Sequence, residues 1–130
     1  MPRQEKCVVV VEDDASMSRA IERLLRTASF QPVMFSSAEA LLQTNAVSAA
    51  GCLILDVRLP GLSGFELHQR LTAGGTVPPV IFITAHDTPS AREQARDLGK
   101  FLCKPFPGRE LVAAVKSATE SGSRPGDESN

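Results

Sequence analysis

The side chains of this sequence that could do chemistry each stand directly after a short apolar run. In chain order they are Glu12, Asp13, Asp14, Asp56, Thr84 and Lys104. Crowded carboxylates repel one another, and Mg²⁺, which prefers carboxylate oxygens and water, relieves that repulsion. A lysine or a hydroxyl can bind phosphoryl oxygens. The set is therefore typical of phosphoryl transfer onto a carboxylate, and Asp56, which ends the central apolar run, is the expected nucleophile.

Each of these residues also has a simple structural explanation when it is taken alone. An acidic run is common at a helix N-terminus, where the helix dipole favours carboxylates. Asp56 could be a turn residue, Thr84 a strand or capping residue, and Lys104 a lysine that faces solvent. Because four separate strand ends carry these groups together, we favour the functional interpretation.

Short apolar runs alternate with longer amphipathic stretches along the chain. We predict strands at 7–11, 31–35, 52–55, 79–84 and 101–103. We predict helices over 17–28, 37–43, 65–73, 89–98 and 109–119. Ser16 is the expected N-cap of the first helix, and Ser36 with Glu39 has the spacing of a capping box for the second.

This order of elements predicts the fold class. Strands that are apolar throughout indicate a sheet covered on both faces. Their alternation with helices indicates an α/β fold of parallel βαβ units with right-handed crossovers. In such an open sheet the binding crevice lies outside the carboxyl ends of the strands. The acids, the hydroxyl and the lysine should therefore meet at one edge.

Length and charge exclude several classes of protein. The 130 residues suit one domain, which we place at 1–120, with 121–130 as a disordered tail or the start of a linker to an effector domain. The net charge of −1 without a basic stripe argues against direct nucleic-acid binding. No apolar run approaches the roughly 20 residues of a membrane span, and no signal peptide is expected at the N-terminus.

The cysteine pattern indicates a cytoplasmic protein with reduced thiols. Cys7, Cys52 and Cys103 lie far apart, each within or beside an apolar run, which suits neither a zinc ribbon nor a disulfide scaffold. A soft metal site would need His68 or His86 beside them, and it is the less favoured interpretation.

Four segments of the chain resemble the receiver domain of bacterial two-component response regulators. They are residues 10–14, 53–64, 81–85 and 101–106, within a similarity that extends from about Lys6 to Ala118. The motif Asp-x-x-x-Pro-x-x-x-Gly, here Asp56, Pro60 and Gly64, is the most specific part. The resemblance implies a flavodoxin-like (βα)5 fold, a doubly wound parallel five-stranded sheet with strand order 2-1-3-4-5.

The resemblance also implies a function. Asp56 would accept a phosphoryl group from a sensor histidine kinase or a phosphotransfer protein in a Mg²⁺-dependent reaction. Asp13 and Asp56 would bind Mg²⁺ directly, Glu12 through water, and Arg58 through its backbone carbonyl, while Asp14 stands just outside this set. The domain would be a signalling module, not an enzyme that acts on other molecules, although it would promote its own phosphorylation and dephosphorylation.

The remaining roles carried over by position concern the switch. Thr84 would be the switch hydroxyl and Phe101 the switch aromatic. Lys104 would bind the phosphoryl group, and the Lys104–Pro105 bond would be cis. Arg58 and His86 would tune hydrolysis of the acyl phosphate. Two departures from the family pattern affect the output surface, because the chain from Thr84 to Lys104 is short and Phe101 lacks a tyrosine hydroxyl.

Three alternative interpretations fit the sequence less well. A receiver-like binding module that signals without phosphorylation should lack an acid or the lysine, and here all are present. A haloacid-dehalogenase phosphatase needs Asp-x-Asp-x-Thr where residues 12–16 read Glu-Asp-Asp-Ala-Ser. A nucleotide-binding loop fails because Gln94 stands where its first glycine should be. The expected partners are the phosphodonor protein and, on phosphorylation, a second copy of the chain.

Overall fold

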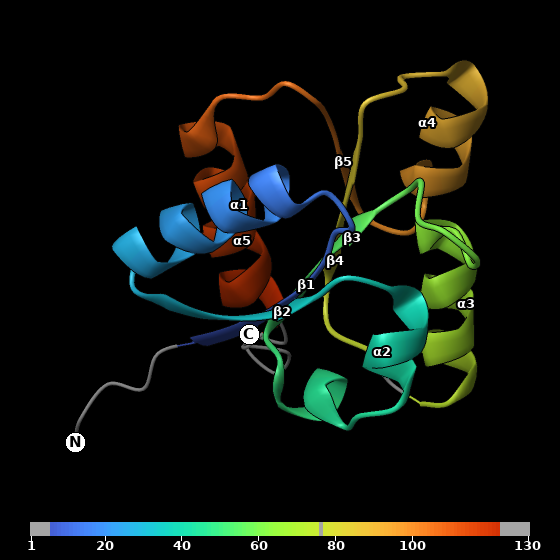
Figure 1. Ribbon diagram of the computed structural model, residues 1–130, viewed down its shortest axis with the longest axis horizontal. Helices are drawn as coiled ribbons and strands as arrows, with labels where there is room; N and C mark the ends of the chain where they lie inside the picture. The colour runs from blue at the N-terminus through green and yellow to red at the C-terminus, as the bar shows by residue number, and fades with distance from the viewer. Residues whose placement is uncertain (1–5, 76, 123–130) are drawn as a thin grey trace, which may run out of the picture.

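Strands and helices alternate throughout the computed structural model, which describes residues 6–75 and 77–122 (Figure 1). The strands are β1 (Lys6–Val11), β2 (Phe30–Phe35), β3 (Cys52–Asp56), β4 (Val80–Thr84) and β5 (Lys100–Cys103). The helices are α1 (Ala15–Thr27), α2 (Ala38–Leu42), α3 (Gly64–Ala73), α4 (Pro89–Arg96) and α5 (Gly108–Gly122). One 3₁₀ helix, η1 (Ala46–Ala49), precedes β3 and was not predicted.

The five strands form one parallel sheet in the order β2-β1-β3-β4-β5, as predicted. Every residue of β3 and β4 is buried, which accounts for their unbroken apolar sequences. Figure 1 shows α1 and α5 on one face of the sheet and α2, α3 and α4 on the other. The sequence therefore predicted the fold class correctly.

Alternate residues of each strand enter two separate cores. Val8 and Val10 of β1 point toward the core shared with α1 and α5, which also contains Ile21 and Leu111. Val9 and Val11 pack into the other core, together with Phe82 and partners from α2, α3 and α4. This period-2 alternation leaves no polar face on the central strands, so their polar groups are confined to the strand ends.

Two predicted helix caps are wrong. The N-cap of α1 is Asp14, whose side chain accepts a hydrogen bond from the backbone N–H of Ser16. The N-cap of α2 is Ser37, not Ser36, and its hydroxyl accepts from the N–H of Ala40 at 3.1 Å. At both helix starts the predicted residue and the observed cap each have a short side chain with an oxygen acceptor, as N-caps require. The tertiary path of the chain decides which of the two caps the helix.

Other boundaries differ from the prediction by one to three residues. β4 begins at Val80 and α4 ends at Arg96, three residues before Gly99. A Cβ on Gly99 would overlap the backbone oxygen of Val80, so the chain must leave the helix early to pass this strand closely. α5 continues to Gly122, so residues 121 and 122 of the tail predicted at 121–130 belong to this helix, whereas 123–130 lie outside the described residues. Across the described ranges, no helix is long and apolar enough to span a bilayer.

Candidate functional site

Glu12 is held inside the carboxyl edge of the sheet. Its backbone N–H continues the β1–β2 ladder by donating to the oxygen of Phe35 at 3.0 Å, and the residue is 1% exposed. Its Oε2 accepts from the N–H of Asp14 at 3.1 Å. The carboxylate of Asp14 caps α1 and lies outside the acidic group, which consists of Glu12, Asp13 and Asp56. Asp13 is the exposed member of this group.

Asp56 ends β3 and is 4% exposed. Its Oδ1 accepts from the backbone N–H of Arg58 at 3.0 Å, which orients the carboxylate at the start of the loop. The loop returns immediately against this strand, because the N–H of Gly64 donates to the oxygen of Val57 at 2.9 Å. A Cβ at Gly64 would lie 2.4 Å from the backbone oxygen of Asp56, so only glycine fits this return.

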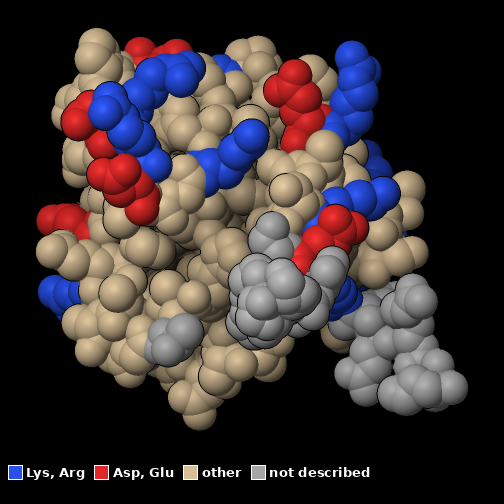
Figure 2. Space-filling view, turned by 180° about the vertical axis from the view of Figure 1, so that it is seen from behind, with Lys and Arg blue, Asp and Glu red and all other residues tan. Residues whose placement is uncertain are grey.

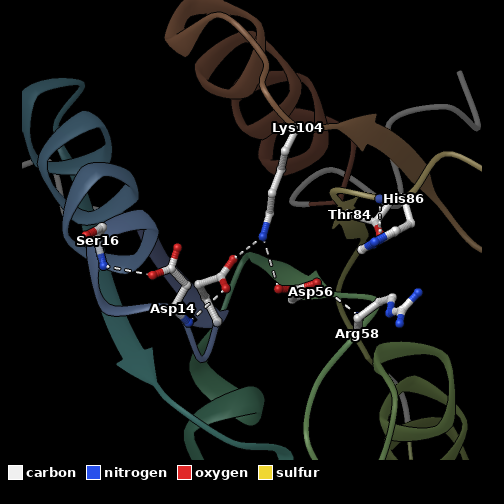
Figure 3. A network of polar contacts seen from close by, with 8 residues as sticks. Asp14, Ser16, Asp56, Arg58, Thr84, His86 and Lys104 are labelled. Atoms are coloured by element: carbon white, nitrogen blue, oxygen red, sulfur yellow. Dashed lines mark hydrogen bonds and ion pairs between the residues drawn. The ribbon is translucent and has the colours of Figure 1, made fainter.

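Lys104 joins the two buried acids, as Figure 3 shows. Its backbone N–H donates to the oxygen of Thr84 at 2.7 Å, and the following bond to Pro105 is cis, the geometry that the resemblance implies. The ammonium Nζ lies 2.9 Å from Oε1 of Glu12 and 3.1 Å from Oδ2 of Asp56. Lys104 thus contacts Glu12, which is 92 positions away in the sequence, and Asp56, which is 48 positions away.

The electrostatics of this group reflect its burial. Burial raises the pKa of Glu12 to about 7, and the neighbouring Asp56 carboxylate raises it as well, against the opposing effects of Lys104 and of the Asp14 N–H. For Lys104, burial disfavours the charged form, but the hydrogen bonds to Glu12 and Asp56 outweigh it, so that the pKa of the ammonium is raised. One cation therefore serves two carboxylates, and the site retains an excess of negative charge.

The acidic group suits a hard cation. Carboxylate oxygens of Glu12, Asp13 and Asp56 all lie within 4.8 Å of one another. Mg²⁺ takes a few carboxylate oxygens and keeps several waters, and the exposure of Asp13 leaves this side of the group open to water. The three carboxylates therefore fit Mg²⁺, and the excess negative charge of the site favours it electrostatically.

Thr84, Arg58 and His86 lie on the opposite side of Asp56 from Asp14 (Figure 3). Thr84 is fully buried, and its Oγ1 accepts from the backbone N–H of His86 at 3.1 Å. The three residues line a groove of about 390 Å³ that also includes residues of α4. The predicted switch hydroxyl is therefore tied to the β4–α4 loop at 85–88.

Phe101, the predicted switch aromatic, lies on β5 and is half-buried against the core of α2, α3 and α4. The guanidinium of Arg92 stands over its ring, 5.1 Å from the centroid. Sequence reasoning missed Arg92, because nothing in the helical pattern of 89–98 distinguishes it from Arg96. Sequence reasoning also missed that Gly64 packs against the backbone of Asp56. The available signal was a glycine directly after Ser63, at the start of a helix.

Comparison with known proteins identifies the family. The model of the response regulator receiver domain matches residues 8–116. Nodulation protein W of Bradyrhizobium diazoefficiens is 44% identical over 115 residues, covering 87% of this chain and 51% of that protein. Transcriptional regulatory protein FixJ of the same organism is 40% identical over 114 residues, covering 85% and 55%. The chain spans about half the length of the curated relatives it matches.

Solved structures agree with this identification. A response regulator receiver protein from Burkholderia phymatum is 42% identical with a TM-score of 0.75, covering 89% of this chain and 96% of that one. Response regulator StyR is 36% identical with a TM-score of 0.82, covering 92% and 62%. The fold, the acidic edge and these similarities lead to one conclusion: the chain belongs to the receiver domain family of two-component response regulators.

Proposed function

We propose that Asp56 accepts a phosphoryl group from a phosphohistidine on a cytoplasmic sensor kinase or phosphotransfer protein. The supporting observation is the ammonium of Lys104, which lies within hydrogen-bonding distance of Asp56 and Glu12 beside the acidic group. From this position the ammonium can donate to an oxygen of a phosphoryl group on Asp56 and offset part of the negative charge that the transfer adds. Small phosphodonors such as acetyl phosphate should serve the same site.

The transfer is a displacement at phosphorus. A carboxylate oxygen of Asp56 forms a bond to phosphorus while the phosphorus–nitrogen bond of the donor breaks, and the electron pair returns to the imidazole nitrogen. Lys104, which now donates to Glu12 and Asp56, would donate to a phosphoryl oxygen, and the N–H of Arg58 would continue to orient the Asp56 carboxylate. Mg²⁺ bound by Asp13, Asp56, the carbonyl of Arg58 and, through water, Glu12 would supply charge neutralisation for the phosphoryl oxygens. The product is a labile acyl phosphate.

The modified carboxylate would act on the switch residues. The phosphoryl group adds negative charge and acceptor oxygens beside the groove. The Thr84 hydroxyl would leave the N–H of His86 and donate to the phosphoryl group, and Phe101 would turn inward. Arg58 and His86, at the mouth of the groove, would control the access of the water that hydrolyses the acyl phosphate. The altered face of α4 and β5 would then bind an output partner or a second copy of the chain.

Intact-mass spectrometry tests the acceptor. Incubation with acetyl phosphate and Mg²⁺ should add one phosphoryl group, about 80 Da, and chelation of Mg²⁺ should abolish the gain. Asp56→Ala should show no gain. Asp14→Asn is the matched control, because asparagine caps a helix as well as aspartate does and Asp14 lies outside the acidic group. An equal gain in Asp56→Ala would reject Asp56 as acceptor, and no gain in the wild type would favour a binding module that signals without phosphorylation.

A further inference from the structure

An ion pair and an aromatic contact connect the β4–α4 loop to β5. Asp87, in the loop, binds Arg92 of α4 through two hydrogen bonds, Oδ1 to Nε at 2.5 Å and Oδ2 to Nη2 at 2.8 Å. The same guanidinium lies 5.1 Å from the centroid of the Phe101 ring. Acidic and basic side chains stand side by side at the upper left of Figure 2, where the turn from Figure 1 places α4.

This connection begins at Thr84. The Thr84 hydroxyl accepts from the N–H of His86, the residue directly before Asp87. After Asp87, Thr88 caps α4 by accepting from the N–H of Ala91 at 3.0 Å. The loop is therefore fixed at both ends, and Asp87 stands between the two fixed points. A movement of Thr84 away from the His86 N–H would release the end of the loop next to Asp87, and with it the anchor of Arg92.

The two-pronged geometry distinguishes Arg92 from its neighbours. A bidentate pair fixes the plane of a guanidinium, which a single contact does not do. Arg96, one turn later on α4, makes one hydrogen bond to Glu93 at 2.7 Å, and the cation–π contact found in the described ranges involves Arg92 alone. The pairing is mutual, since hydrogen bonding to Arg92 lowers the pKa of Asp87 and hydrogen bonding to Asp87 raises the pKa of Arg92.

We propose that Arg92 is a positioning residue that, anchored by Asp87, retains the Phe101 ring in its half-buried place and couples it to Thr84. To turn inward, the ring must leave the guanidinium. The β4–α4 loop, which is tied to Thr84 through the His86 N–H, therefore controls Phe101 through an ion pair on the surface. This proposal rests on the proposed function, because it assigns a control to the same switch. Exposed cation–π contacts are weak, so the expected effect on the switch is about two- to fivefold.

Fluorine NMR can follow the ring directly. The chain has six phenylalanines and neither tyrosine nor tryptophan, so labelling with 4-fluorophenylalanine gives six resonances, and Phe101→Leu identifies the one of interest. Spectra are recorded for the wild type, Arg92→Gln, Arg92→Lys and Asp87→Asn, with Arg96→Gln as the matched control on the same helix. Beryllofluoride with Mg²⁺ is then titrated into each protein to mimic the acyl phosphate.

Without beryllofluoride, Arg92→Gln and Asp87→Asn should move the Phe101 resonance toward its position in the beryllofluoride-saturated protein, and Arg96→Gln should not. Raising the salt concentration should have the same effect on the wild type and none on Asp87→Asn, because exposed ion pairs are screened. The beryllofluoride concentration at half-saturation should fall about two- to fivefold in Arg92→Gln and Asp87→Asn. Arg92→Lys keeps the positive charge, so its resonance position and half-saturation concentration should lie between those of Arg92→Gln and the wild type.

The proposal is overturned if both variants keep the wild-type resonance and half-saturation, or if Arg96→Gln changes them equally. A failure of the proposed function looks different. In that case beryllofluoride leaves every spectrum unchanged, while the unliganded spectra still report whether Arg92 and Asp87 position the ring.

Discussion

Gly64→Ala should destabilise the domain and disturb the acceptor together, because this glycine packs directly on the strand that ends in Asp56. The added Cβ would lie 2.4 Å from the backbone oxygen of Asp56 and 3.1 Å from Cα of Val57. Both are backbone atoms and cannot turn aside as a side chain would. Relief requires the loop to move outward, which also lengthens the 2.9 Å hydrogen bond from the Gly64 N–H to Val57. Overpacking of this kind costs about 1–3 kcal/mol.

Urea unfolding measures this loss. The chain has no tryptophan or tyrosine, so unfolding is followed by far-ultraviolet circular dichroism. A loss of about 2 kcal/mol, with a slope of about 2 kcal/mol per molar urea, lowers the midpoint by about 1 M. Because the added Cβ presses on the backbone oxygen of Asp56, the end of β3 is displaced as well, and the rate of phosphorylation by acetyl phosphate should fall.

Gly74→Ala is the control for the loss of a glycine. Gly74 ends α3 with φ −88° and ψ −2°, and a Cβ there would have its nearest neighbours at 3.6 and 3.7 Å, ordinary contact distances. The unfolding free energy of Gly74→Ala should equal that of the wild type or exceed it by at most about 0.4–1 kcal/mol. Its urea midpoint should therefore not fall. The steric argument fails if Gly64→Ala unfolds at the wild-type urea concentration, or if Gly74→Ala loses as much.

Two further predictions concern charged groups. Lys104→Met should lower the unfolding free energy, measured by urea unfolding, by about 1–3 kcal/mol at pH 8, because the Glu12 and Asp56 carboxylates lose their cation. At pH 5.5 the loss should be smaller, because Glu12, with a pKa of about 7, is then protonated. Burial lowers the pKa of His68, so the unfolded state binds more protons and stability falls as the pH drops through 6.5. Across pH 5.5–7.5, the wild type should lose more unfolding free energy on acidification than His68→Gln does.

The sequence predicted the sheet and the chemical groups at its edge because both depend on local pattern. Unbroken apolar strands that alternate with amphipathic helices admit few arrangements other than a parallel sheet covered on both faces. The carboxyl ends of such strands share one edge, so the positions of Glu12, Asp56 and Lys104 followed from their places directly after strands. Helix ends were predicted less well, since Ser16 and Ser36 satisfy the capping preference as fully as the residues that actually cap.

Contacts between loops were decided by the tertiary structure. The sequence placed Lys104 at the correct edge, but only the packed fold brings its ammonium to 2.9 Å from Glu12 and 3.1 Å from Asp56 and raises the pKa of Glu12 to about 7. Arg92 and Arg96 are equivalent in the helical pattern, yet only Arg92 reaches Phe101. The physical reason is the same in each case: propensity and periodicity act over a few neighbouring residues, whereas distance, burial and charge at the site depend on how strands and helices remote in sequence pack together.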